Sequence, residues 1–245
     1  MSASIKQLNH LEQQLDRYFG QHTAASQQLA DLLGNACQPQ KLVALLEQLI
    51  NSPDMLAQVA RRSYQHGNGF LKVVLLNKGY KLRLHVWHQG ETCEENIHNH
   101  RWSFASTVVA GTLRSEIWRN ATPGSLNATA FPEYRYYAAT ETQPAHARHL
   151  GNCLLEKEKD QVVSAGESYF MPEGQLHCIN NPGKHLVATL VCTSPTGRGA
   201  NRLIKTRSQI EPDTNPPRLQ AAGLRRQLQR FLALYEEQLC TSPVC

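Results

Sequence analysis

The chain has 245 residues, of which 41% are hydrophobic and 18% charged, so it can build a folded core and is not expected to be disordered. Its length fits one or two domains. No run approaches the roughly eighteen consecutive apolar residues of a membrane-spanning helix, and residues 1–6 lack the pattern of a secretory signal. We therefore expect a cytoplasmic protein with no membrane partner.

The net charge of +5 is unevenly distributed along the chain. Between Arg198 and Arg230 there are eight basic and only two acidic residues. Such a segment can attract nucleic acid, although a solvated helix face is the more frequent explanation. Because no nucleic-acid motif accompanies it, we expect no nucleic-acid partner.

The cysteines do not form a recognisable framework. There are seven, with scattered spacing and no C-x-x-C pair. A disulfide scaffold or a cysteine-based zinc site is therefore not expected, and the pattern indicates free thiols in a reducing compartment.

Residues 1–66 are predicted to be a helical N-terminal elaboration. Four helices are expected, over residues 4–18, 26–33, 39–50 and 52–64. Ser4 and Gln7 form a capping box at the start of the first, and Gly34 is expected to end the second. Pro39 and Pro53 occupy first-turn positions of the third and fourth.

From Gly67 to about Cys192 the pattern changes to that of short antiparallel strands. The segment is rich in Val, Thr, Tyr and Trp, with turn residues between short runs, which is typical of a sandwich or barrel. Residues 81–87 alternate strictly, and a turn at Gly111 separates strands at 106–110 and 113–118. We predict a β-barrel over 67–200, followed by a basic loop and a C-terminal helix within 201–245.

Histidines carry the strongest chemical signal. Of eleven, eight fall between His85 and His185, and two form the H-x-H pair His98 and His100. In a strand, residues two apart point to the same face, so both imidazoles can reach one ion.

A second motif connects a third histidine to this pair. Gly166, Pro172, Gly174, His177 and Asn181 follow the pattern G-x5-P-x-G-x2-H-x3-N. This resembles the second motif of the cupin superfamily, in which the glycines and proline permit tight turns.

The first cupin motif is met in part, by His98, His100 and Gly111, whereas its glutamate falls at Phe104. The resemblance covers residues 67–200. It implies a mainly β fold, a jelly-roll cupin barrel, with a metal in its lumen held by His98, His100 and His177. Three neutral imidazoles leave the full charge on the ion and open positions for a substrate or O2. The alternative is a metal-free cupin whose histidines are structural.

Among cupins, the chain resembles the cysteine dioxygenase group of thiol dioxygenases. Shared features are helices before the barrel, three histidines without the glutamate, the strand ending at Trp87, and the Thr193-Ser-Pro segment. The group's cysteine–tyrosine crosslink would fall at Ala105 and Thr193, so its specificity is not expected to carry over. The resemblance implies an Fe(II) dioxygenase for a small thiol- or amino-acid-like substrate, with a homodimer as a possible assembly.

The substrate side of the site depends on one strand register. Arg83, His85 and Trp87 share one face of strand 81–87. If that face lines the lumen, Arg83 can bind a carboxylate bidentately and His85 can act as acid or base, with Lys72 as a second cation. The opposite register, with the leucines inward, is an equal alternative.

Two other function classes stay open at this point. One is a non-redox isomerase or lyase that uses Zn, Mn or Ni as a Lewis acid. The other is a cupin that binds a small ligand without catalysis. Two further residue groups are weaker candidates: Tyr134, Tyr136 and Tyr137 for a phenol at the site, and His146 with His149 for a second metal.

Overall fold

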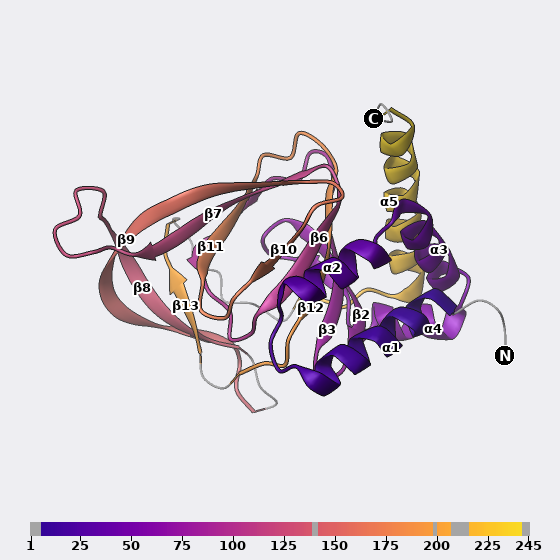
Figure 1. Ribbon diagram of the computed structural model, residues 1–245, viewed down its shortest axis with the longest axis horizontal. Coiled ribbons are helices and arrows are strands. Elements are labelled where there is room, and N and C mark those ends of the chain that lie inside the picture. The colour runs from indigo at the N-terminus through magenta and orange to yellow at the C-terminus, as the bar shows by residue number, and fades with distance from the viewer. Residues whose placement is uncertain (1–5, 139–141, 198–199, 207–215, 242–245) are drawn as a thin grey trace.

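The computed structural model describes residues 6–138, 142–197, 200–206 and 216–241. Within these residues, helices come first, strands follow, and one long helix comes last (Figure 1). The helices are α1 (Lys6–Gln21), α2 (Gln27–Ala36), α3 (Pro39–Ile50), α4 (Pro53–Ala60) and α5 (Ala221–Thr241).

The strands divide into an early, a middle and a late group along the chain. The early strands are β1 (Tyr64–His66), β2 (Phe70–Asn77), β3 (Lys81–Trp87), β4 (Cys93–Glu94) and β5 (Ile97–His98). The middle strands are β6 (Phe104–Ala110), β7 (Thr112–Asn120), β8 (Thr129–Tyr137) and β9 (His146–Ser164). The late strands are β10 (Ser168–Met171), β11 (Leu176–Asn181), β12 (Val187–Thr193) and β13 (Asn201–Ile204).

These strands form two antiparallel sheets. One has the order β1-β2-β3-β12-β6-β10, and the other the order β4-β11-β5-β13-β8-β9-β7. In the second sheet β11 also pairs with β7, so this sheet closes on itself. The long strand β9 pairs with β8 through its first half and with β7 through its second half, and it reaches the end of the molecule farthest from α5 (Figure 1). The predicted mainly β fold, a jelly-roll barrel with helical additions, is confirmed.

The helical layer explains how the six-stranded sheet sorts its side chains. Leu82, Leu84 and Val86 of β3 are fully buried in one core cluster with leucines of all five helices. The apolar stripe of α3, predicted from its leucines, packs in the same cluster. Because the helices bury the aliphatic face of β3, Arg83, His85 and Trp87 are left to face the inside of the barrel.

Three boundaries differ from those expected. The helix α2 does not stop at Gly34 but continues to Ala36, and a Cβ at Gly34 would lie only 3.0 Å from Oγ of Ser168. Gly34 therefore permits close packing of α2 on β10 and is not a terminator. The fourth helix ends at Ala60, and residues 64–66 form β1 instead. The strand β13 lies beyond residue 200, in a segment predicted to be loop.

The turn glycines adopt the conformation that their motif requires. Gly111, Gly166 and Gly174 all have positive φ, of 68°, 90° and 83°. Such angles are unfavourable for other residues, so the cupin-like motif is matched by its backbone as well as by its letters. The capping box at Ser4 lies outside the described residues.

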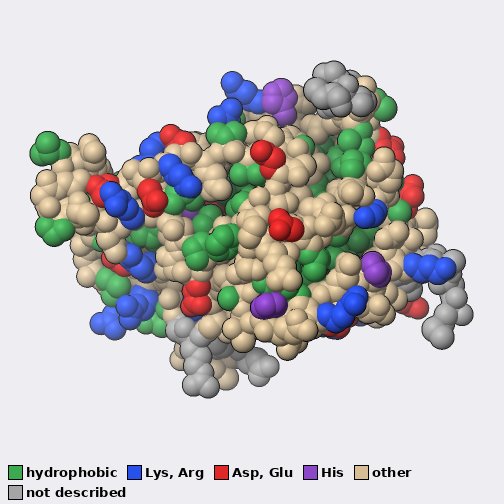
Figure 2. All heavy atoms as spheres, in the orientation of Figure 1, with side chains coloured by type: hydrophobic (Ala, Val, Ile, Leu, Met, Phe, Trp, Pro, Cys, Tyr) green, Lys and Arg blue, Asp and Glu red, His purple; other side chains and the backbone are tan. Residues whose placement is uncertain are grey.

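The surface and the thiols add two findings. Acidic and basic side chains are interspersed on the face shown in Figure 2. Of the helices described, none is both long and apolar enough to cross a membrane. The six cysteines within the described residues are all free thiols.

Candidate metal centre and substrate cavity

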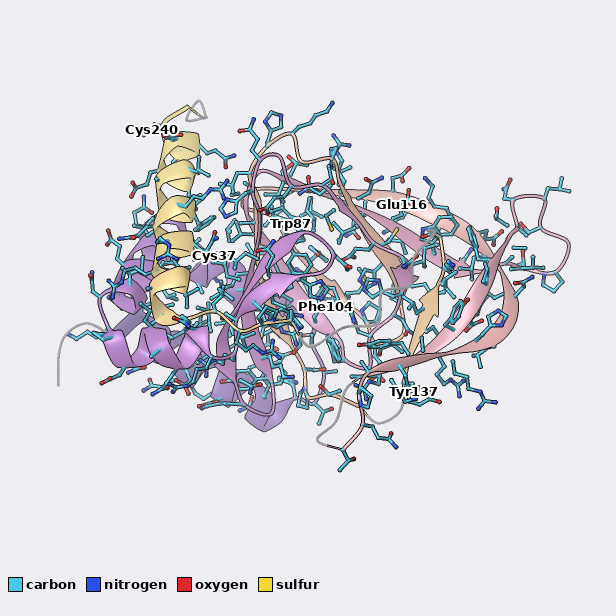
Figure 3. All side chains as sticks on the ribbon, turned by 180° about the vertical axis from the view of Figure 1, so that it is seen from behind. Cys37, Trp87, Phe104, Glu116, Tyr137 and Cys240 are labelled. Carbon is cyan, nitrogen blue, oxygen red and sulfur yellow. The ribbon has the colours of Figure 1, made fainter. Side chains whose placement is uncertain are left out.

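A cavity of about 810 Å³ lies between the two sheets. Its volume falls within the range of roughly 300–1,000 Å³ that is usual for small-molecule sites. Figure 3 shows Trp87 and Phe104, both of which line it, between the helices and the lobe that carries Glu116 and Tyr137. All seven residues selected from the sequence line this cavity: Lys72, Arg83, His85, Trp87, His98, His100 and His177.

Strand pairing brings the three candidate metal ligands together. His98 of β5 and His177 of β11 are direct partners in the antiparallel register, and His100 follows two residues after His98. Their ring centroids are 4.7 to 5.1 Å apart. One ligand atom from each lies within 4.8 Å of the others, close enough for one ion to draw the three imidazoles together.

Hydrogen bonds set which nitrogen of two ligands is available. Nδ1 of His98 lies 2.9 Å from the carbonyl oxygen of Asn96, and Nδ1 of His177 lies 3.1 Å from that of Gln175. A carbonyl oxygen only accepts, so each Nδ1 donates its hydrogen and each Nε2 keeps its lone pair. This is the arrangement that metal-binding histidines require.

Burial keeps two of the three ligands, His100 and His177, neutral. Desolvation lowers the pKa of His177 to about 3, with a smaller effect from His98. It also lowers the pKa of His100 well below its ordinary value. Neutral imidazoles are the form that binds a metal ion, so the donor set fits a divalent cation.

Phe104 occupies the position at which the cupin pattern has a glutamate. Its ring centroid lies 5.8 Å from that of His100 and 6.0 Å from that of His177. The nearby Glu95 accepts hydrogen bonds from the Asn68 side chain and from the Ile179 backbone N–H. Within the described part of the chain, the one group of metal-ligating side chains is therefore made of histidines alone.

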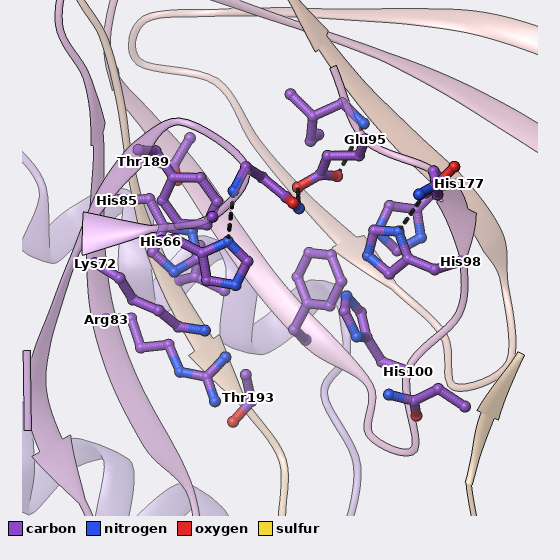
Figure 4. A pocket seen from close by; sticks show the side chains of 18 of the residues that line it. His66, Lys72, Arg83, His85, Glu95, His98, His100, His177, Thr189 and Thr193 are labelled. Atoms are coloured by element: carbon purple, nitrogen blue, oxygen red, sulfur yellow. Dashed lines mark hydrogen bonds between the residues drawn. The ribbon is translucent and has the colours of Figure 1, made fainter. Parts of the chain in front are cut away.

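The other wall of the cavity is a polar row across the six-stranded sheet. Tyr64, Lys72, His85 and Thr189 are successive register partners on β1, β2, β3 and β12. In Figure 4, Lys72 and Arg83 extend side by side from this wall, on the opposite side of the pocket from the three histidines. The structure thus places the candidate substrate-binding residues opposite the candidate metal ligands.

Arg83 is the most buried cation of this wall. It is 9% exposed, its Nε forms no hydrogen bond, and burial lowers its pKa. Nε2 of His85 and Nε1 of Trp87 are likewise buried without a hydrogen-bond partner among the described residues. Nε of Arg83 and Nε1 of Trp87 can only donate; buried donors without partners are costly, and in a cavity they mark where a ligand's oxygens would accept hydrogen bonds.

Several residues that line the cavity were not predicted from the sequence. His66 stacks on Phe70 with ring centroids 4.5 Å apart, and its pKa is lowered to about 3, mainly by desolvation. Tyr64 and His66 are two residues apart, the spacing of side chains that share one face of a strand. Because a helix was expected to reach Tyr64, this spacing did not lead to the prediction of a strand. Tyr169, at a position that the motif of His177 leaves free, also lines the cavity, as does Glu95, which shortly precedes the H-x-H pair.

The weaker candidates are mostly placed elsewhere. His146 stacks on Tyr137 and His149 packs against Tyr134, in the β8–β9 pairing. Of the tyrosine cluster, Tyr136 lines the cavity.

Comparisons with known proteins find similar solved structures only. No family model and no curated protein matches the sequence. A recombinant oxalate oxidase in complex with glycolate is 19% identical with a TM-score of 0.28, and the match covers 50% of this chain and 45% of that one. The chain thus spans less than half of the oxalate oxidase.

Two further structures are similar to a comparable degree. An RmlC-like cupin from Shewanella frigidimarina NCIMB 400 is 17% identical with a TM-score of 0.33, covering 55% of this chain and 83% of that one. A hydroquinone 1,2-dioxygenase in complex with Cd2+ and 4-hydroxybenzonitrile is 14% identical with a TM-score of 0.31, covering 51% and 65%. The structural neighbours thus include a cupin, an oxidase and a dioxygenase.

Proposed function

We propose that this protein is a mononuclear non-haem Fe(II) dioxygenase that oxidises a small, anionic, thiol- or amino-acid-like substrate with O2. The observation that carries the proposal is the carboxylate-free donor set of His98, His100 and His177, with Phe104 at the fourth position. Three neutral ligands leave the full 2+ charge on an ion and free coordination positions beside it. Membership of the cysteine dioxygenase-like group, a cytoplasmic location and a homodimer remain predictions.

The protein's own side chains would hold and orient the substrate. Arg83 offers a planar guanidinium fork that suits a carboxylate, and Lys72 adds a second cation on the same wall. Trp87 is 2% exposed and closes one side of the pocket, which excludes water from the reacting groups. Burial lowers the pKa of His85 well below its ordinary value, so this imidazole is neutral and would contact the substrate as an uncharged hydrogen-bonding group.

A bound Fe(II) ion would supply an open-shell, redox-active centre that lets O2 react with a closed-shell substrate, and the substrate itself would provide the electrons that reduce O2. The protein positions that ion by holding His98 and His177 through their backbone carbonyl partners. The apolar ring of Phe104 keeps a fourth protein ligand away from the ion.

Oxygen uptake tests the proposal. The protein is reconstituted anaerobically with Fe(II), and O2 consumption is followed on addition of thiols and amino acids. We expect uptake that depends on Fe(II) and on substrate, is lost in His177→Ala, and persists in His185→Ala, since His185 is exposed outside the cavity. Full uptake in His177→Ala would refute the proposal.

One observation favours a second candidate, a non-redox metal enzyme. A three-histidine donor set also serves catalytic zinc sites, in which the metal acts as a Lewis acid. Turnover of a substrate under strict anaerobiosis, with zinc, manganese or nickel bound, would support this alternative. Tight binding of a small acid without turnover under either condition would indicate a ligand-binding protein.

A further inference from the structure

Aromatic side chains are concentrated in the cavity. The chain has three Trp, eight Tyr and six Phe. Seven of these line the cavity, against only four Val, Leu or Ile within the described residues. The chain as a whole has the opposite balance, with 31 Leu, 12 Val and 7 Ile against those seventeen aromatic residues. The cavity is therefore lined selectively by rings.

The strands β2 and β3 produce this selection. Their aliphatic residues, including Leu71, Leu82 and Leu84, pack against the helices. Phe70 and Trp87 belong to a different cluster and line the cavity. An apolar pocket could have been built from the leucines, but the register directs the rings inward instead.

The inward rings form a continuous wall centred on Phe70. Its centroid lies 4.5 Å from that of His66, 4.8 Å from that of His85 and 5.0 Å from that of Trp87. Tyr64 extends the wall by stacking near His66, at 6.0 Å. Aromatic rings prefer offset-stacked or edge-to-face partners at these separations, so the wall offers ring-specific contacts to a ligand.

Arg83 supplies the charge at this wall. Its guanidinium carbon lies 5.6 Å from the centre of the Trp102 ring. The cavity's one carboxylate within the described residues is Glu95, whose oxygens accept hydrogen bonds from Asn68 and Ile179. A buried guanidinium is strongly destabilised without an anionic partner, so a ligand that provides one gains affinity here.

We propose that the substrate of this cavity is an aromatic carboxylate, with its ring against the Phe70–Trp87 wall and its carboxylate on Arg83. This inference narrows the proposed function, because it assumes that the cavity beside the three histidines is where the substrate binds. The cavity volume of about 810 Å³ leaves room for a benzene ring with substituents.

Binding of simple acids tests the inference without requiring any reaction. The dissociation constants of benzoate, cyclohexanecarboxylate and benzyl alcohol are measured by calorimetry on the full chain under argon. Cyclohexanecarboxylate has the same charge and a similar size but no aromatic ring, and benzyl alcohol has the ring without the charge. We expect benzoate to bind about three-fold or more tighter than cyclohexanecarboxylate.

Variants separate the contribution of the charge from that of the aromatic wall to the binding of benzoate. Arg83→Met should weaken benzoate by about ten-fold or more and change benzyl alcohol by less than about two-fold. Arg83→Lys keeps the charge without the fork and should retain part of the affinity. Trp87→Leu should abolish the preference for benzoate over cyclohexanecarboxylate. Phe131→Leu, a matched ring deletion in a different core cluster, should leave that preference intact.

Three results would overturn the inference: equal affinity for the two acids, no effect of Arg83→Met on benzoate, or no binding of either acid at millimolar concentrations. The outcome is separable from that of the proposed function. Tighter binding of benzoate than of cyclohexanecarboxylate, without iron-dependent O2 uptake, would refute the dioxygenase proposal and support the aromatic-acid site. O2 uptake with an aliphatic thiol, together with equal binding of the two acids, would support the dioxygenase proposal and refute the aromatic-acid site.

Discussion

The indole of Trp102 lies parallel to the imidazole of His100, with 4.8 Å between ring centroids and 13° between ring planes. His98 and His177 are each oriented by a hydrogen bond from Nδ1 to a backbone carbonyl. Nδ1 of His100 has no such partner within the described residues. We infer that stacking on Trp102, with the more distant edge contact of Phe104, orients the third ligand.

Replacing Trp102 should consequently weaken metal binding. In Trp102→Leu we expect the affinity for Zn(II) or Fe(II) to fall roughly ten- to a hundred-fold, as when the orienting partner of another metal ligand is removed. Competition with a chromophoric chelator measures the affinity. Trp118→Leu is the matched control, because Trp118 packs on Phe131 outside the cavity. Equal affinities for the two variants would show that the stacking does not orient His100.

Phe104 can be converted into the missing fourth ligand. In Phe104→Glu we expect Mn(II) or Zn(II) to bind about ten-fold more tightly than in the wild type, or tighter still, because a carboxylate would join three neutral ligands. Without metal, the same variant should lose about 3 kcal/mol of unfolding free energy, since it buries an unpaired charge in place of a ring. Phe104→Gln should show the instability without the gain in affinity. A loss of affinity in Phe104→Glu would place Phe104 away from the ion.

The stability of the metal-free protein should depend on pH. The pKa values of His66 and His177 are lowered from 6.5 to about 3 in the folded protein. Above pH 6.5 both are neutral whether folded or unfolded, but below it only the unfolded chain takes up protons. Stability should therefore fall as the pH drops from 6.5 towards 3. Urea melts should show a shallower fall in His66→Gln than in His10→Gln, which alters an exposed histidine of α1.

Replacing Gly111 should strongly lower the free energy of unfolding. Its φ is +68°, and a Cβ there would collide with the backbone carbonyl oxygen of Leu186. We expect Gly111→Ala to lower the unfolding free energy by about 3 kcal/mol, from strain and collision together. Gly124 also has a positive φ, of 81°, but open space around it, so Gly124→Ala should cost only about 1 kcal/mol. Equal costs in thermal melts would contradict the collision.

The metal ligands could be predicted from the sequence because their spacing is local. His98 and His100 are two residues apart, and His177 lies in a turn motif whose glycines and proline constrain the backbone. The alternation of β3 likewise defined which side chains share a face. These signals need no knowledge of what packs on either side of the sheet.

Which face of β3 lines the cavity could not be predicted in the same way. Leu82, Leu84 and Val86 would face the interior of an isolated barrel, but the N-terminal helices cover them on the outside. That outcome depends on docking of α1 to α4 against the sheet, which lies outside the strand's own pattern. The inward position of His66 was missed for a related reason, since β1 exists only through its pairing with β2.

The most direct test of the central claim is the metal content of the purified protein, measured by mass spectrometry beside His177→Ala and His185→Ala. The three-histidine centre predicts near-stoichiometric metal in the wild type and in His185→Ala, and loss of that metal in His177→Ala. Iron would support the dioxygenase, whereas zinc, manganese or nickel would favour the Lewis-acid alternative. Metal retained in full by His177→Ala, or none bound by the wild type after reconstitution with Fe(II), would contradict the centre.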